Sequence, residues 1–206
     1  MHHRYSLLAL AAVLGLLSCR REGQPSAPAA PAPVVAPAAP AAPAVAIEAL
    51  TKAAMDGDLA TVKSALANPA AANSADPDGR TALMLAAFNG HTAVVALLLD
   101  AGAKIDTRDQ IQRTALMYAA SGANDATVAL LVKRGAGVNL ADNEQHWTPL
   151  MFAAAEGQLG VARILLAAGA DPAAADTDGE DSVMFARSKN FTELADLIAA
   201  AKARKR

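Results

Sequence analysis

Cysteine is nearly missing from this chain, in which Cys19 is the single cysteine among 206 residues. No internal disulfide is therefore possible, and the fold must be held by packing even in an oxidising compartment. Aromatic residues make up only 3% of the chain, while hydrophobic residues reach 53% because alanine is abundant. Alanine favours helices and lets them pack closely, so the composition indicates an all-α protein.

A strong excess of charge is also lacking, since the formal net charge is -2 and the isoelectric point is near 6.1. No broad positive field would attract a nucleic-acid backbone, so we expect no nucleic-acid partner. The chain ends in a short basic tail that is either a small basic patch or a solvated helix end, where the helix dipole favours positive charge. Its shortness favours the second reading of Lys202, Arg204, Lys205 and Arg206.

The first residues are typical of a secretory leader, in which Arg4 precedes an apolar run over residues 7–17 that is too short to span a bilayer comfortably. The run ends in Leu16-Leu17-Ser18-Cys19. This sequence resembles the bacterial lipoprotein signal, in which the cysteine is lipidated and becomes the new amino terminus, although Ser18 stands where Gly or Ala is commoner. The resemblance implies a signal peptide over residues 1–18 and lipidation of Cys19, with plain secretion as the competing interpretation.

We expect residues 19–46 to form a tether. Seven prolines between Pro25 and Pro43 prevent a continuous helix and favour extended, semi-stiff polyproline II segments. Two or more acyl chains at Cys19 would hold the protein on a membrane that it does not cross. In lipoproteins, an aspartate after the cysteine often signals retention at the inner membrane, whereas Arg20 and Arg21 follow here. The resemblance therefore implies the periplasmic face of the outer membrane.

A repeat carries most of the information in the remaining chain. Two series of residues recur in the same register, with four tetrapeptides that start 33, 34 and 33 residues apart. Such a period is typical of stacked helical units, and a fifth, earlier copy begins near residue 47. The tetrapeptides are Thr81-Ala82-Leu83-Met84, Thr114-Ala115-Leu116-Met117, Thr148-Pro149-Leu150-Met151 and Asp181-Ser182-Val183-Met184, and the second series is Ala53, Ala86, Ala119, Ala153 and Ala186.

The copies resemble the ankyrin repeat, whose unit is two antiparallel helices and a projecting hairpin-like loop. In one copy, Thr81 would cap the first helix, Ala86 and Ala87 would allow close helix approach, and Gly90 would turn the chain. The resemblance implies an all-α ankyrin-repeat solenoid of about five helix-turn-helix repeats over residues 47–206, in which each unit packs on its neighbours. The repeats fall approximately at residues 47–78, 79–111, 112–145, 146–178 and 179–206. Turn-forming aspartates open the four loops: Asp76, Asp109, Asp142 and Asp176.

Some positions depart from the family pattern. Methionine stands where the family usually has a histidine that hydrogen-bonds near the threonine, so we expect that polar tie to be absent. We expect Met84, Met117, Met151 and Met184 to form an apolar ladder between repeats instead of a binding or redox stripe. The residues that follow them, Leu85, Tyr118, Phe152 and Phe185, should also be core. Gln112 and Ala123 replace expected glycines in the third copy, which predicts less regular turns there.

Partners of ankyrin-like proteins usually contact the loop tips and the exposed side of the first helices. Mixed charge with isolated apolar residues on this surface suits a folded protein partner, although only a minority of the residues should matter. Trp147 lies on a loop lengthened by one residue, and it either anchors a partner or folds back over the edge of repeats three and four. Carried over position by position, the surface comprises Asp78, Arg80, Phe88, Asn89, Ile111, Arg113, Glu144, His146, Trp147, Glu156 and Lys189.

No catalytic constellation is recognisable. After removal of the leader only His91 and His146 remain, which do not make a tetrahedral zinc set without cysteine. A stretch from Asp176 to Gly179 resembles the start of a calcium loop, but Arg187 stands at the twelfth position. We find no phosphate-binding loop and no serine, base and acid at recognisable spacing.

These observations predict a monomeric, non-catalytic protein that needs no metal and no cofactor. We expect a scaffold or adaptor, tethered to the bacterial envelope, that binds a periplasmic protein through its loop tips and concave face. The alternative is an inhibitor or immunity protein that blocks a toxin or cell-wall enzyme. The fold by itself predicts binding and not the identity of the partner.

Overall fold

The computed structural model describes residues 44–204, which form a row of helix pairs joined by long loops. The predicted signal peptide, Cys19 and most of the predicted tether lie outside these residues, as do Lys205 and Arg206. The first helices of the pairs are α1 (Ala44–Asp56), α3 (Ala82–Phe88), α5 (Ala115–Ser121), α7 (Pro149–Ala155) and α9 (Ser182–Ser188). The second helices are α2 (Leu59–Ala65), α4 (Thr92–Asp100), α6 (Asp125–Lys133), α8 (Leu159–Ala167) and α10 (Thr192–Arg204). The prediction of an all-α solenoid of about five repeats is confirmed.

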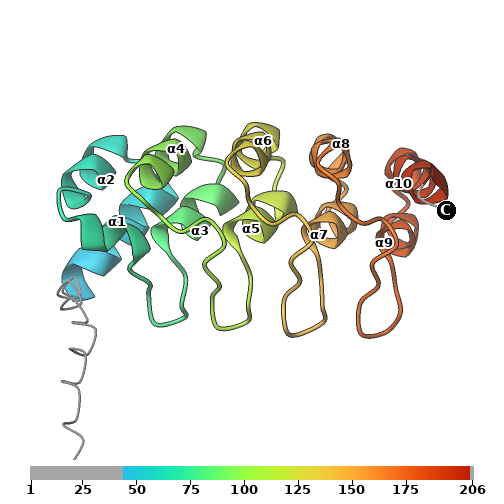
Figure 1. The fold of residues 1–206 in the computed structure, drawn as a ribbon, viewed down its shortest axis with the longest axis horizontal. Helices are drawn as coiled ribbons and strands as arrows, with labels where there is room; N and C mark the ends of the chain where they lie inside the picture. Colours follow the sequence, from blue (N-terminus) through green and yellow to red (C-terminus); the bar gives the residue numbers. More distant parts are fainter. Residues whose placement is uncertain (1–43, 205–206) are drawn as a thin grey trace, which may run out of the picture. The chain divides into compact units, whose positions relative to one another are not determined.

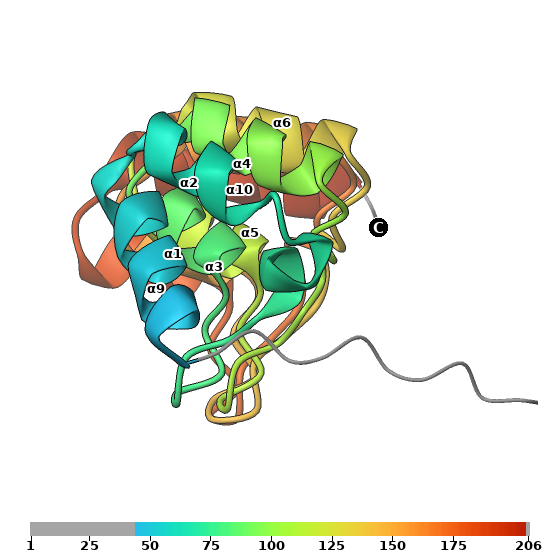
Figure 2. The same ribbon diagram turned by 90° about the vertical axis from the view of Figure 1, so that its left-hand side faces the viewer.

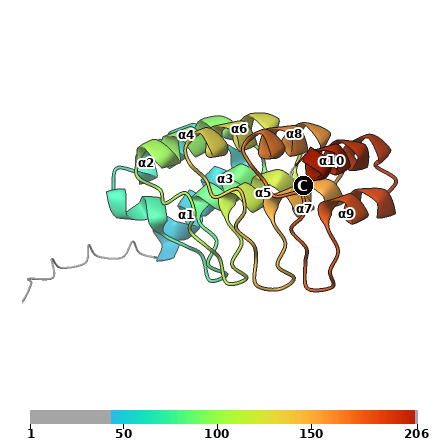
Figure 3. The same ribbon diagram turned by 45° about the vertical axis from the view of Figure 1, so that its right-hand side comes forward.

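The helices form two layers, and the loops project from one side of them (Figure 1). The first helices lie side by side between the layer of second helices and the loops. Viewed along the stack, successive loops lie behind one another (Figure 2), and an oblique view shows that they all point the same way (Figure 3). A short 3₁₀-helix, η1 (Pro69–Asn73), precedes the first of these loops. The stack therefore presents one edge built from loop tips.

Threonine caps two of the first helices with help from methionine. The hydroxyl oxygens of Thr81 and Thr148 accept hydrogen bonds from the backbone N–H groups of Met84 and Met151, both at 3.4 Å. The sulfur atoms of these methionines in turn accept from the threonine N–H groups, again at 3.4 Å. The expectation that no hydrogen bond replaces that of the family's histidine was therefore wrong for Met84 and Met151, because their thioether sulfur is a weak acceptor in the same place.

The other two copies begin their first helices differently. Thr114 is fully buried, and its hydroxyl group has no hydrogen-bond partner in the described part of the chain. Asp181 replaces threonine at α9, where its carboxylate accepts from the N–H groups of Val183 at 2.9 Å and Met184 at 3.0 Å. The same carboxylate forms an ion pair with Lys202 of α10. The register predicted from sequence thus holds, while the cap chemistry varies.

Small side chains let the first helices approach one another. The alanine pairs of α3, α5 and α7 are fully buried, and each second helix inserts at least one fully buried aliphatic side chain into the core. Burial of each such aliphatic side chain contributes about 1.5–3 kcal/mol relative to exposure. The aliphatic residues are Val62, Leu98, Leu131, Leu165 and Ile198, and the alanine pairs are Ala86 and Ala87, Ala119 and Ala120, and Ala153 and Ala154.

The methionine ladder is only partly as predicted. Met84, Met117 and Met151 are at most 1% exposed, whereas Met184 is 48% exposed. The reason is that no helix pair follows the pair of α9 and α10 in the described chain. The expectation that Met184 is core was therefore wrong. Of the residues that follow the methionines, Phe152 is buried, but Leu85, Tyr118 and Phe185 are only half-buried.

The third copy has an irregular turn after its first helix and a regular loop before it. After α5, the C-cap Gly122 takes ψ 166°, whereas the corresponding C-caps Asn89 and Glu156 take ψ 2°. Ala123, which follows in the place of Gly90, does not share that glycine's positive φ. The loop is different, because Gln112 adopts φ 64° in the place where Gly79 has φ 80°. The loop therefore keeps its shape without glycine, and the predicted irregularity appears only in the turn.

Candidate protein-binding surface

The aspartate that opens each loop folds the loop around its own carboxylate. In the loop between α4 and α5, one carboxylate oxygen of Asp109 accepts from the N–H groups of Ile111 at 3.0 Å and Arg113 at 2.8 Å. Its other oxygen accepts from the hydroxyl group of Tyr118 at 2.7 Å. Asp76, Asp142 and Asp176 accept two backbone N–H groups in the same manner. The predicted loop openers thus set the shape of the tips.

Backbone hydrogen bonds also join neighbouring tips. We call the four loops at residues 76–80, 109–113, 142–147 and 176–180 the loop edge. Along it, the N–H of Gln110 donates to the carbonyl of Asp78 at 3.1 Å, and that of Asn143 donates to the carbonyl of Ile111 at 3.2 Å. The N–H of Thr177 donates to the carbonyl of Gln145 at 3.1 Å. One backbone-to-backbone hydrogen bond therefore spans each gap between consecutive loops.

The two predicted arginines of the loop edge are already paired. The guanidinium group of Arg80 lies 2.9 Å from Asp76 and 2.8 Å from Asp78. The hydrogen bond with Asp76 raises the pKa of Arg80, although partial burial opposes this. Arg113 lies 3.4 Å from Asp142 and 3.5 Å from Glu144.

Arg113 also has an aromatic neighbour, because its guanidinium carbon is 5.1 Å from the centre of the Phe152 ring. A guanidinium group over an aromatic face is a favourable cation–π arrangement. Arg113 and Arg80 therefore present oriented groups that need little reordering when a partner binds.

A small hollow of about 240 Å³ lies where two loops meet α5, lined by Asp78, Arg80, Asp109, Gln110, Ile111 and Tyr118. Burial, followed by the hydrogen bond to Asp109, raises the pKa of Tyr118 to about 12, so the hydroxyl group is protonated at neutral pH. Beside it, the ring of Phe88 is 51% exposed and packs edge-to-face on Tyr118, with the ring centres 6.2 Å apart. The hollow brings three sequence-predicted residues, Asp78, Arg80 and Ile111, to one place.

Trp147 folds back instead of projecting from its loop. Its ring centre is 5.2 Å from that of Phe152 and 4.7 Å from that of Phe185, and its indole N–H donates to Asp176 at 3.3 Å. Of the two arrangements left open by the sequence, the folded-back one is present. Its position differs from the prediction, since the ring bridges toward Phe185 of the fifth repeat and does not lie across repeats three and four. His146, at the exposed tip, takes φ 60°.

The other predicted contact residues lie apart from this hollow. Asn89, Glu156 and Lys189 are the exposed C-cap residues of α3, α7 and α9. Asn89 donates its side-chain N–H to the carbonyl of Met55 at 3.1 Å, so it also joins two repeats. His91 does the same with a ring nitrogen 2.9 Å from that carbonyl.

Sequence reasoning missed part of the surface. Asp178 and Glu180 are exposed on the last loop at the positions that Asp78 and Arg80 occupy on the first, so the 33-residue register could have identified them. Met55, at the end of α1, is 45% exposed near Asn89, but no marker in the first copy singles it out. The exposed loop edge is thus more acidic at its C-terminal end than the predicted residues indicate.

Residues 44–204 contain no group of three or more histidine, cysteine, aspartate or glutamate side chains placed to hold a metal ion. Asp176 in particular uses one carboxylate oxygen for the N–H groups of Asp178 and Glu180, as the loop-opening role requires. Within the same residues, none of the helices combines the length and apolar character needed to cross a bilayer.

Comparison with known proteins agrees with the geometry. The family model described as ankyrin repeats, in three copies, matches residues 50–142 and again residues 105–176. Together these matches cover more than half of the 206 residues. A search among curated proteins finds no match.

Proposed function

This chain belongs to the ankyrin-repeat family, whose members are protein–protein interaction modules, and we propose that it is an adaptor that holds a protein partner against its loop edge. The partner would also contact the adjoining side of the first helices. The observation that carries this proposal is the row of hydrogen-bonded loop tips beside the exposed ring of Phe88.

Two properties of the loop edge support binding. Its side chains are oriented before a partner arrives, because the loop carboxylates and the inter-loop hydrogen bonds fix the backbone. Pre-organisation lowers the entropy lost on association. In addition, Phe88 offers apolar area beside Tyr118, which lines the hollow together with the charged Asp78 and Arg80. An apolar centre with a polar rim is the usual anatomy of an interface.

We also propose that the adaptor acts at the bacterial envelope, where lipidated Cys19 would anchor it on the periplasmic face of the outer membrane. The basis is the sequence Leu16-Leu17-Ser18-Cys19 and the proline-rich stretch after it. Metabolic labelling with a radioactive fatty acid tests this part. We expect the wild type to carry label and to sediment with membranes, and Cys19→Ser to lose both properties. Unlabelled wild-type protein in the soluble fraction would leave plain secretion as the explanation.

The partner-binding face can be tested by affinity purification of the full chain from envelopes. The binding variant is Phe88→Ala with Glu144→Ala, since both side chains are exposed and neither is part of the core. The matched control is Leu59→Ala with Asp196→Ala, which also removes one exposed apolar and one exposed acidic side chain, but from second helices. We avoid Trp147 because its removal would disturb the packing of two repeats.

We expect a protein that is enriched with the wild type and the control to be lost with the binding variant. Circular dichroism should show that all three chains are equally folded. Equal recovery with both variants would contradict the proposed face. The inhibitor alternative predicts, in addition, that the partner is an enzyme whose activity falls on one-to-one binding.

A further inference from the structure

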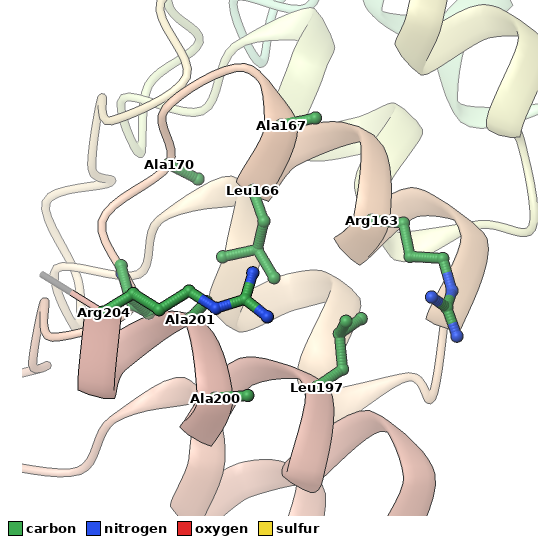
Figure 4. A pocket seen from close by; sticks show the side chains of 9 residues that line it. Arg163, Leu166, Ala167, Ala170, Leu197, Ala200, Ala201 and Arg204 are labelled. Atoms are coloured by element: carbon green, nitrogen blue, oxygen red, sulfur yellow. The ribbon is translucent and has the colours of Figure 1, made fainter.

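A second hollow, of about 490 Å³, lies between α8 and α10, in the layer of second helices and away from the loop edge (Figures 1 and 4). Leu166 and Leu197 face it from the two helices, and alanine side chains form much of the remaining wall. The volume is within the range of sites that enclose small ligands or single large side chains. The apolar lining comprises Leu166, Ala167, Ala170, Pro172, Leu197, Ala200 and Ala201.

Two alanines line the hollow at positions where an earlier pair of helices has an ion pair. The fully buried Leu98, Leu131, Leu165 and Ile198 give the register of the second helices. Counted from these residues, Asp100 of α4 corresponds to Ala167 of α8, and Arg134 corresponds to Ala201 of α10. Asp100 and Arg134 bridge α4 and α6 at 2.8 Å. Between α8 and α10 the same two positions carry only methyl groups.

Two guanidinium groups border the hollow, and no carboxylate is among the residues that line it. Arg163 reaches Glu193 at 3.1 Å, and this exposed ion pair is weak. Arg204 forms no ion pair with any other residue between 44 and 204, and its side chain extends over the hollow toward Leu166 (Figure 4). The lining is therefore apolar, with positive charge at its border.

We propose that this hollow is a second docking site, which takes a leucine- or phenylalanine-sized side chain from a partner protein whose neighbouring residue is a glutamate or aspartate. The apolar side chain would cover Leu166 and Leu197. The carboxylate would pair with Arg204, whose planar group can bind both oxygens. The site goes beyond the proposed adaptor function, because it would allow the stack to hold a second protein while the loop edge is occupied.

The test uses the purified full chain and two short peptides, acetyl-Glu-Leu-Phe-Glu-amide and its Gln-Leu-Phe-Gln analogue, with binding followed by backbone amide NMR. The first peptide should shift the signals of Ala167, Ala200 and Ala201. Arg204→Ala should weaken its binding by about tenfold, the loss expected for one charge-assisted hydrogen bond. The glutamine peptide should bind the wild type more weakly by a similar factor.

The closing control is the double variant Ala167→Asp with Ala201→Arg, which places the Asp100 and Arg134 pair in the hollow. It should abolish binding of the acidic peptide while leaving the urea unfolding midpoint unchanged or raised. The proposal would be overturned if the closing variant still bound the peptide, if both peptides bound equally, or if the shifts fell on the loop edge. Shifts produced by decanoate but by neither peptide would also overturn it, since they would identify a lipid site.

Discussion

Gln112 holds a backbone conformation that favours glycine, and its replacement gives a sharp test of how the loops are built. At the same place in the four loops, φ is 80° for Gly79, 64° for Gln112, 60° for His146 and 81° for Gly179. The Gln112 side chain forms no hydrogen bond with the described residues, so Gln112→Gly removes backbone strain and little else.

The size of the effect follows from two opposing contributions. A left-handed conformation costs a residue with a Cβ atom about 1–2 kcal/mol. Glycine loses more conformational entropy on folding, which reduces the gain in the free energy of unfolding by about 0.5–1 kcal/mol. The net expectation for Gln112→Gly is an increase of about 0.5–1 kcal/mol in the free energy of unfolding. For a domain of this size the melting temperature should rise by about 2 °C.

Urea unfolding followed by far-UV circular dichroism measures this difference, provided that the slope of the transition is unchanged. Two reverse substitutions calibrate it. A Cβ atom at Gly79 would lie 3.1 Å from the nitrogen of Gln110 and 3.2 Å from the Cα of Asp109, so Gly79→Ala should destabilise by strain and crowding. At Gly179 nothing lies within 4 Å, so Gly179→Ala should be less harmful. An unchanged or lower midpoint for Gln112→Gly would refute the reasoning.

Three further predictions concern side chains. Trp147→Ala should lower the free energy of unfolding by about 2–3 kcal/mol in urea, because a half-buried indole and two aromatic contacts are lost. The folded-state pKa of Tyr118 is raised to about 12, so the contribution of this shift to the free energy of unfolding is complete below pH 10 and is lost as the pH rises toward 12. In Tyr118→Phe, the free energy of unfolding should lack this decrease between pH 10 and pH 12. Burial favours a higher pKa for Asp181, but hydrogen bonds from Lys202 and the backbone lower it, so the advantage of the wild type over Asp181→Asn should shrink below about pH 4.

The repeat architecture could be predicted because its determinants are local and recur. Thr81, Ala86 and Gly90 mark positions that recur every 33 or 34 residues, and this register holds even where another residue or another cap stands at the position. Burial of the alanine pairs, and of Leu98, Leu131, Leu165 and Ile198 in the second helices, follows from that register. A single copy would have been ambiguous, whereas copies in register define which face of every helix is covered.

Features that depend on a neighbouring repeat or on the rest of a loop were harder to predict. Met184 has the same sequence position as Met84, yet it is 48% exposed because its exposure depends on a following helix pair. Gln112 and His146 adopt the glycine conformation because the surrounding loop forces it, which local preference does not reveal.

The candidate surface was predicted as a set of positions but not as an arrangement. Its members were transferred one by one, and the sequence could not show that Arg80 and Arg113 are bound by carboxylates. Nor could it show which way Trp147 turns. Phe152 and Phe185 were both predicted to be core, so neither was expected to be accessible for contact with the Trp147 ring. Side-chain packing between repeats is a tertiary property, and no single repeat encodes it.

The hydrogen bonds between loop tips have a mechanical consequence. Because the N–H groups of Gln110, Asn143 and Thr177 each bind a carbonyl of the preceding loop, the loop edge resists extension along the stack. The opposite layer of second helices is held mainly by side-chain packing, which yields more easily to small shifts. When the stack bends, the second helices should therefore move apart or together while the spacing of the loop tips stays constant. A partner that spans several loops would meet binding groups at a fixed interval.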